Sequence, residues 1–273
     1  MRTPSQKTFV RRLLRWYRRR GRSLPWRRTT DPYRILVSEV MLQQTQVERV
    51  IPKYREFLRR YPSIADLARA HVREVREVWY PLGYNIRPVR LWEIANAVVR
   101  RYDGQIPAQR DRLLALKGIG PYTAGAVLAF AYGRRVPVLD TNVRRVLRRV
   151  FHGRRMPDRV LWRLAARLLP RNAYDFNQAL MDFGATLCTA RAPQCPACPM
   201  RDFCKSYPRF ARLAARLLPR NAYDFNQALM DFGATLCTAR APQCPVCPMR
   251  DVCKSYPRFA RLATRRTARR RRV

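Results

Sequence analysis

Apolar side chains recur at helical spacing along most of this chain. Near the N-terminus they stand at positions 9, 10, 13, 14 and 17, on one face of a helix over Phe9–Arg20. The same spacing predicts five further helices, over Arg34–Thr45, Asp66–Trp79, Val89–Tyr102, Tyr122–Tyr132 and Val143–Phe151. Short breaks with glycine or proline separate them, and no alternating run of strand length stands out. The pattern predicts an all-α protein.

The C-terminal half contains a near-identical repeat. Residues 163–211 recur 49 positions later as residues 212–260, with Val246 in place of Ala197 and Val252 in place of Phe203. Repeat proteins usually diverge and need several copies to bury a core. Two near-identical copies therefore indicate a recent duplication or an error of sequence assembly.

All eight cysteines fall in this repeat, in two sets that each read C-x6-C-x2-C-x5-C. The first set is Cys188, Cys195, Cys198 and Cys204, and the second is Cys237, Cys244, Cys247 and Cys253. Such tight spacing favours metal or cluster ligation over disulfides. Four thiolates suit an iron–sulfur cluster, and a four-cysteine zinc site is the chemical alternative.

The charge is extreme. The 57 lysines and arginines against 18 acidic residues give a formal net charge of +39. A polyanion such as nucleic acid would neutralise this self-repulsion, although a genome rich in arginine codons or a hot-living source would also explain it. No apolar run is long enough to span a membrane and no secretory signal is recognisable. We therefore expect a cytoplasmic, nucleoid-associated protein with no membrane partner.

Three short motifs carry candidate chemistry. In Leu116–Ala124, Gly118 and Gly120 flank one apolar residue before a helix, so backbone N–H groups can hold a phosphate there. In Ser38–Gln46, Glu39 lies in an otherwise apolar stretch, and the glutamines that follow can read a base edge. In Val138–Val146, Asp140 stands at a helix start, where it caps the helix or serves as a second carboxylate.

The order of these motifs resembles the endonuclease III superfamily of helix-hairpin-helix DNA glycosylases, most closely the MutY-type adenine glycosylases. The matching blocks are L-P-W-R at 24–27, S-E-V-M-L-Q-Q-T-Q-V at 38–47, L-G-Y at 82–84, the hairpin, L-D-T-N-V at 139–143 and the cysteine spacing. The resemblance covers about residues 8–207, and the block at 38–47 and the cysteines are its most specific parts.

The resemblance implies a two-lobed fold. Residues 30–136 would form a six-helix barrel with the helix-hairpin-helix. Residues 1–29 and 137–211 would form a lobe with one [4Fe–4S] cluster on the first cysteine set, which follows Val150 at the usual distance. Residues 212–260 duplicate the cluster segment and could hold a second cluster, and residues 261–273 form a basic tail.

The resemblance also implies roles for individual residues. Glu39 would protonate the base, with a raised pKa, and an ionised Asp140 would face the sugar cation. Tyr122 and Asn142 would support these carboxylates, and Gln44 and Tyr84 would insert into the base stack. Trp26 and Arg27 would lie beside the flipped base. Further DNA contacts would come from Gln43, Lys117, Gly118 and Gly120. Bifunctional relatives have a lysine at position 122, so a tyrosine there predicts a monofunctional glycosylase.

Two departures leave the substrate open. Adenine-removing relatives usually carry a C-terminal domain that recognises 8-oxoguanine, whereas this sequence ends soon after the second cysteine set. Thr141 replaces their usual glycine. The interpretation is a monomer that acts on mismatched or damaged double-stranded DNA and removes adenine opposite guanine or 8-oxoguanine. The alternatives are removal of thymine or uracil opposite guanine, a DNA-binding iron–sulfur protein without catalysis, and a zinc-dependent scaffold.

Overall fold

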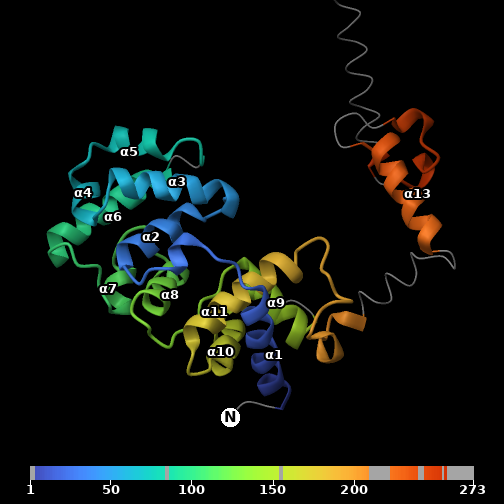
Figure 1. Ribbon diagram of the computed structural model, residues 1–273, viewed down its shortest axis with the longest axis horizontal. Coiled ribbons are helices and arrows are strands. Elements are labelled where there is room, and N and C mark those ends of the chain that lie inside the picture. The colour runs from blue at the N-terminus through green and yellow to red at the C-terminus, as the bar shows by residue number, and fades with distance from the viewer. Residues whose placement is uncertain are drawn as a thin grey trace, which may run out of the picture. The chain divides into compact units, whose positions relative to one another are not determined.

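The computed structural model describes residues 4–83, 86–153, 156–208, 222–238, 243–253 and 255–256. The chain divides into two compact units, Met1–Pro208 and Arg209–Val273. Every regular element within the described ranges is a helix (Figure 1), which confirms the all-α prediction. None of the helices among these residues is long and apolar enough to cross a membrane.

One hydrophobic core of the first unit lies among the helices between residues 24 and 138. These elements are η1 (Pro25–Arg27), α2 (Pro32–Met41), α3 (Val47–Arg60), α4 (Ile64–Arg69), α5 (Val72–Trp79), α6 (Ile86–Tyr102), α7 (Arg110–Leu114) and α8 (Pro121–Phe130). Helix α8 is buried along almost its whole length, from Thr123 to Phe130. It packs against α2, which is similarly apolar, so these two helices form the centre of the lobe.

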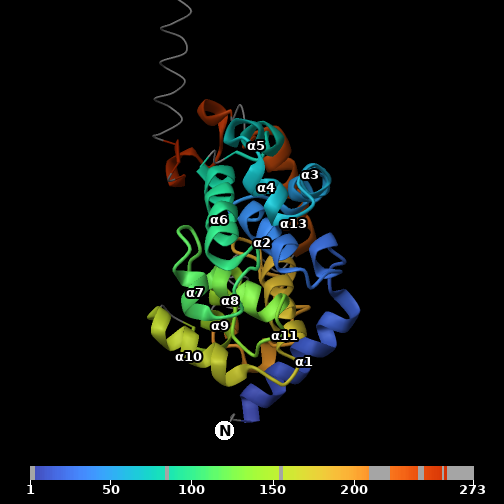
Figure 2. The ribbon, with the colours of Figure 1, turned by 90° about the vertical axis from the view of Figure 1, so that its left-hand side faces the viewer.

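A second core joins the N-terminal helix to the later helices. Its elements are α1 (Pro4–Arg20), α9 (Thr141–Phe151), α10 (Asp158–Leu168), α11 (Ala173–Asp182), the π-helical turn η2 (Phe183–Leu187) and η3 (Arg201–Phe203). The ring of Phe9 meets that of Phe151 edge-on, with centroids 5.0 Å apart. Trp16 packs in the same way on Phe183, at 5.1 Å. Figures 1 and 2 both show α1 beside α10 and α11, away from α3–α6.

The single helix expected over Asp66–Trp79 is wrong, because the chain forms two helices there, α4 and α5. Ala70 has extended backbone between them, and its carbonyl accepts a hydrogen bond from Trp92 Nε1 at 2.9 Å. His71 then caps α5, its Nδ1 accepting from the backbone N–H of Arg73. The apolar spacing continues across this break, so periodicity alone hides it.

Other boundaries also differ from expectation. The helix expected over Arg34–Thr45 ends at Met41, and Gln44 adopts a left-handed backbone with φ 56°. Among the described residues, five α-helices were not predicted: α3, α7, α10, α11 and the helix over Ala222–Thr235. In α3 the buried residues Val50, Tyr54 and Phe57 stand at helical spacing. The signal for this helix was therefore present in the sequence.

The second unit contains α13 (Ala222–Thr235), η4 (Cys244–Val246) and η5 (Arg250–Val252). The helix α13 repeats the sequence that forms α11 and the start of η2 in the first unit. Leu229 is 53% exposed and Met249 is 52% exposed, whereas their counterparts Leu180 and Met200 are 1% and 0% exposed. Identical segments therefore bury different amounts of apolar surface, because in the first copy they pack into the core that also contains α1 and α9.

Candidate active site

Two residues from distant parts of the sequence meet between α2 and α8. Glu39 lies in the last turns of α2 and is only 4% exposed. Tyr122 is the second residue of α8, and its Oη donates a 2.6 Å hydrogen bond to Glu39 Oε2. The close packing of these two apolar helices brings the pair together. The bond engages one carboxyl oxygen, so the other oxygen remains available to carry a proton.

Burial raises the pKa of Glu39 from its usual 4.5 to about 7. The hydrogen bond from Tyr122 acts in the opposite direction, the nearby charge of Asp140 raises the pKa further, and Arg27 lowers it. Desolvation is the largest cause because a charged carboxylate loses its hydration in this apolar surrounding. Glu39 is therefore a carboxyl group that is partly protonated near neutral pH.

Asp140 is the N-cap of α9, so the capping role considered for it is real. Its Oδ1 accepts from the backbone N–H of Val143 at 2.6 Å, and its Oδ2 accepts from Asn142 Nδ2 at 2.9 Å. Burial raises the pKa of Asp140, while these two donors act against burial and favour the carboxylate. Capping and proximity to Glu39 coexist in one side chain. Its ionised state stays a prediction.

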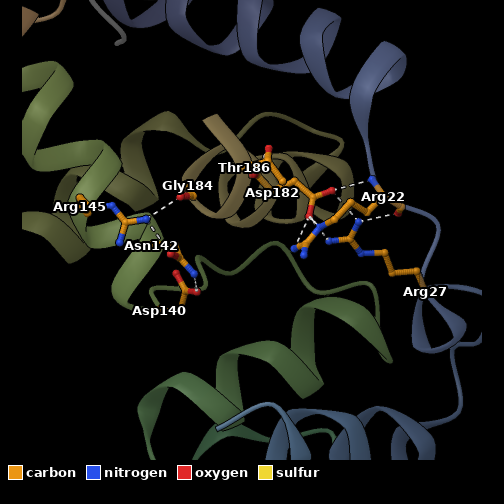
Figure 3. Close-up of polar contacts among 8 residues, drawn as sticks. All are labelled: Arg22, Arg27, Asp140, Asn142, Arg145, Asp182, Gly184 and Thr186. Atoms are coloured by element: carbon orange, nitrogen blue, oxygen red, sulfur yellow. Dashed lines mark hydrogen bonds and ion pairs between the residues drawn. The ribbon is translucent and has the colours of Figure 1, made fainter. Parts of the chain in front are cut away.

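A chain of hydrogen bonds behind Asp140 fixes its orientation (Figure 3). Arg145 Nη2 donates to Asn142 Oδ1 at 2.7 Å, so the amide nitrogen of Asn142 must face Asp140. Arg145 Nη2 also donates to the Gly184 carbonyl, and Arg145 Nε donates to the Cys188 carbonyl at 2.8 Å. The segment that carries the cysteines therefore positions Asp140. Arg145 was not identified from the sequence.

Gly184 allows this approach. A Cβ atom built at this position would lie 2.7 Å from the Cβ of Asn142 and 3.0 Å from its carbonyl oxygen. Real Cβ atoms do not approach that closely, so any other residue would push the start of α9 away from η2. The only sequence feature that pointed to a special role for Gly184 was its place in F-G-A-T-L, just before Cys188.

A buried ion pair ties the N-terminal segment to α11. The side chain of Asp182 is fully buried, and Arg27 grips both of its oxygens at 2.8 Å (Figure 3). Arg22 adds a bond from Nε at 2.8 Å and one from its backbone N–H at 2.9 Å. Burial alone would raise the pKa of Asp182, but the two arginines hold it below its usual value. Asp182 was not identified from the sequence.

Arg27 and Trp26, the residues expected beside a flipped base, are both held by contacts within the protein. Both terminal nitrogens of Arg27 are engaged, one of them also with the Arg22 carbonyl at 2.8 Å. Trp26 is 6% exposed and packs edge-on against Tyr54, with ring centroids 5.5 Å apart. Both side chains thus have a structural role in the packing between the N-terminal segment and its neighbours. Direct contact with a base stays a prediction for each.

The residues expected to meet DNA lie at the surface ends of helices. Gly118 has φ 101°, a left-handed backbone that other residues rarely adopt, and Gly120 is the N-cap of α8. Lys117 beside them is exposed. Gln43 is half-buried and Gln44 is exposed in the turn after α2. Tyr84, the remaining member of this group, lies outside the described residues.

The first cysteine set fits an iron–sulfur cluster chemically. None of these four cysteines forms a disulfide. Arg149 Nη1 lies 3.6 Å from Cys188 Sγ, and the backbone N–H of Met200 lies 3.4 Å from Cys198 Sγ, so donors face the sulfurs as they would face thiolates. Burial raises the pKa of Cys198 to about 12, and a bound cationic cluster would favour its thiolate form. A four-iron cluster takes one thiolate per iron, which matches the four cysteines of this set.

The second cysteine set has a different environment. Cys237 is exposed, whereas its counterpart Cys188 is 9% exposed. Val252, which replaces Phe203, is 73% exposed. In the first copy Phe203 packs against the α9 core and lies 5.6 Å from the guanidinium of Arg12. The second set therefore has the same ligands with less protection from water.

Known proteins resemble the chain over most of the first unit. The family described as HhH-GPD superfamily base excision DNA repair protein matches residues 37–170. The iron-sulfur binding domain of endonuclease III matches residues 188–204 and, a second time, residues 237–253.

Similar proteins carry two different substrate names. The thymine/uracil-DNA glycosylase of Pyrobaculum aerophilum is 44% identical over 198 residues, which are 69% of this chain and 86% of the relative. The adenine DNA glycosylase of Mycolicibacterium smegmatis is 48% identical over 193 residues, and the matched region spans 66% of that protein. The solved structure of a thermostable thymine-DNA glycosylase superposes with a TM-score of 0.72 at 34% identity, covering 75% of this chain and 97% of that one.

Asp182→Asn is expected to lower the free energy of unfolding by about 3 kcal/mol or more, because it leaves two arginines without their buried countercharge. The matched control is Asp202→Asn, which removes the partner of Arg12 from a pair whose side chains are 34% and 58% exposed. The control should cost much less, because solvent screens this exposed pair. Denaturant unfolding of both variants tests this, and equal losses would contradict it.

Cys198→Ser is expected to reduce bound iron and the visible absorbance at about 400 nm, and to destabilise the first unit. Cys247→Ser, the same change in the second set, should leave the first unit's unfolding transition unchanged. Iron and sulfide analysis with thermal unfolding measures both effects. About four iron atoms per chain indicate one cluster, and about eight indicate two. Full iron content in Cys198→Ser would remove the assignment to the first set.

Proposed function

Because this chain belongs to the HhH-GPD superfamily and is a base excision repair DNA glycosylase, we propose that it removes adenine mispaired with guanine or 8-oxoguanine in double-stranded DNA. The observation that carries the proposal is the buried Glu39, whose pKa lies at about 7. The target base is stacked inside the duplex, so the enzyme must extrude it before its glycosidic bond can be reached.

Adenine leaves its sugar readily only after protonation, which requires an acid at the base. Glu39 supplies that acid because burial keeps it partly protonated at neutral pH. Its Oε2 accepts from Tyr122, so the other oxygen delivers the proton to the purine ring. Thymine and uracil leave more readily as anions, and an acid of this kind contributes less to their departure.

Asp140 supplies the opposite charge. Cleavage of the C1′–N9 bond leaves positive charge on the sugar, which a nearby carboxylate stabilises. Val143 and Asn142 hold Asp140 by one oxygen each, and Arg145 prevents the amide of Asn142 from turning. Water then adds to C1′ and its proton passes to the Glu39 carboxylate, which gives free base and an abasic sugar.

The surroundings of Glu39 favour hydrolysis without strand cleavage. Tyr122 occupies the position where an amine nucleophile would stand in bifunctional relatives, and a phenol cannot form a Schiff base. Its hydroxyl is already bonded to Glu39. Lys117 is exposed at the hairpin, where it suits a phosphate. We therefore expect a monofunctional enzyme.

A second candidate substrate is thymine or uracil opposite guanine. Two similar proteins favour it, the thymine/uracil-DNA glycosylase of Pyrobaculum aerophilum and the thymine-DNA glycosylase of Aeropyrum pernix. This chain covers 86% and 93% of their lengths, respectively. The same fold serves this substrate, since the solved thymine-DNA glycosylase superposes with a TM-score of 0.72. The difference between the two substrates lies in the contacts to the extruded base.

A glycosylase assay on labelled duplexes separates these candidates. The duplexes carry A opposite G, A opposite 8-oxoguanine, T opposite G, or U opposite G, and each product is resolved before and after alkali. Breakage of the adenine strand only after alkali is the expected result. Breakage of only the T or U strands would replace the proposed substrate, and breakage without alkali would contradict the monofunctional mechanism.

Glu39→Gln is expected to lower the single-turnover rate by about 10² to 10⁴-fold with duplex binding retained, because the amide cannot donate the proton. In the wild type the rate should fall about tenfold per pH unit above about 7, as the acid is lost. Glu48→Gln, an exposed change on the next helix, is the control. An unchanged rate in Glu39→Gln would remove the catalytic assignment.

The same group links stability to pH. The folded-state pKa of Glu39 is raised to about 7 from 4.5, so ionising it disfavours the folded state as pH rises between these values. The stability of Glu39→Gln relative to wild type should therefore increase by about 2 to 3 kcal/mol from pH 5 to pH 8. Denaturant unfolding at both pH values measures this. A constant difference would show that Glu39 titrates normally.

A further inference from the structure

Arg87, in the first turn of α6, is buried beneath two surface turns. It is 3% exposed, and its guanidinium carbon lies 5.5 Å from the centre of the Trp79 ring. Its terminal nitrogens donate to oxygen atoms of two segments that are far apart in the sequence, residues 40–45 and 82–83. The acceptors are the carbonyls of Val40 (3.2 Å), Met41 (2.8 Å), Gln43 (2.5 Å), Leu82 (3.1 Å) and Gly83 (3.1 Å) and the hydroxyl of Thr45 (3.0 Å).

These acceptors define what Arg87 joins. Val40 and Met41 are the last residues of α2, the helix that carries Glu39, and their carbonyls lie at its negative end. Gln43 and Thr45 flank the left-handed, exposed Gln44. The remaining acceptors belong to the turn at 82–83. One guanidinium therefore fixes two exposed turns to the end of the helix that carries the acid.

The arrangement depends on the planar fork of arginine. Nη1 serves the α2 end and Gln43, while Nη2 serves Thr45 and the turn at 82–83. A lysine has one nitrogen with three protons and cannot hold both sets of acceptors at once. Arg87→Lys thus keeps the charge but separates the two turns.

We propose that Arg87 is a positioning residue for base extrusion: it holds the turns at 43–45 and 82–83 as one rigid element that takes the place of the target base in the helical stack. This inference rests on the proposed function, since it assumes that a base leaves the duplex. Filling the vacated space requires a rigid group, because a mobile turn would lose entropy on insertion. Arg87 has no contact with the reacting atoms in this role.

The experiment measures extrusion separately from cleavage. The full-length, cluster-loaded protein is added at saturation to a duplex with 2-aminopurine next to a mismatched adenine, and fluorescence reports unstacking. Arg87→Lys should give a rise at least about threefold smaller than wild type, and Arg100→Lys, the same change at the exposed end of α6, should match wild type. Cleavage of the mismatched adenine should fall by about tenfold to a hundredfold in Arg87→Lys. Cleavage of an adenine opposite an abasic site, which is easier to extrude, should fall less than about threefold.

Each outcome decides between distinct possibilities. A wild-type fluorescence rise in Arg87→Lys, or equal cleavage losses on both duplexes, would overturn the positioning role. The pH dependence of cleavage near 7 should not move, because Glu39 is untouched.

If Arg87→Lys does not fold, Thr45→Val removes one acceptor of Nη2 and should reduce the fluorescence rise in the same direction. A fluorescence rise without any cleavage in wild type would reject the proposed chemistry and leave the role of Arg87 standing. No rise in wild type would reject both.

Discussion

The rest of the site depends on the ion pairs that the buried carboxylate of Asp182 forms with two arginines. Asp182 lies at the end of α11 and holds Arg22 and Arg27, which connect α1 to the lobe containing α2. An unpaired charge at this depth would be strongly unfavourable, so these groups must remain together. The N-terminal segment is therefore fixed between the two hydrophobic cores, and Arg27 lies close enough to Glu39 to lower its pKa.

The two carboxylates near the site are supported from opposite directions. Glu39 and Tyr122 come from helices of the first core, where apolar packing removes water and raises the pKa. Asp140 comes from the start of α9 in the second core and is oriented through Asn142 by Arg145. Environment can thus give one acid to protonate a base and one carboxylate to face a cation. The cysteine segment enters this arrangement through a backbone carbonyl, that of Cys188.

The duplicated segment shows how much context decides. The two copies share all four cysteines and nearly every neighbouring side chain, yet Leu180 is buried and its counterpart Leu229 is half exposed. In the first copy the backbone N–H groups of Lys205 and Ser206 donate to carbonyls at the end of α9. Such contacts come from the rest of the core, so ligand spacing predicts what a segment can bind but not how well it is protected.

The sequence by itself determined the helical class, the cysteine sets and the block around Glu39, because these depend on local spacing and residue chemistry. It also placed Asp140 at a helix start, since capping is local. Only the tertiary structure decided that Asp182, Arg145 and Arg87 matter, because each acts on groups far away in the chain. It also divided the helix expected over Asp66–Trp79, where the Trp92 bond to Ala70 outweighs periodicity. The pKa of Glu39 is likewise a tertiary property, since it comes from burial by α8 rather than from neighbours in sequence.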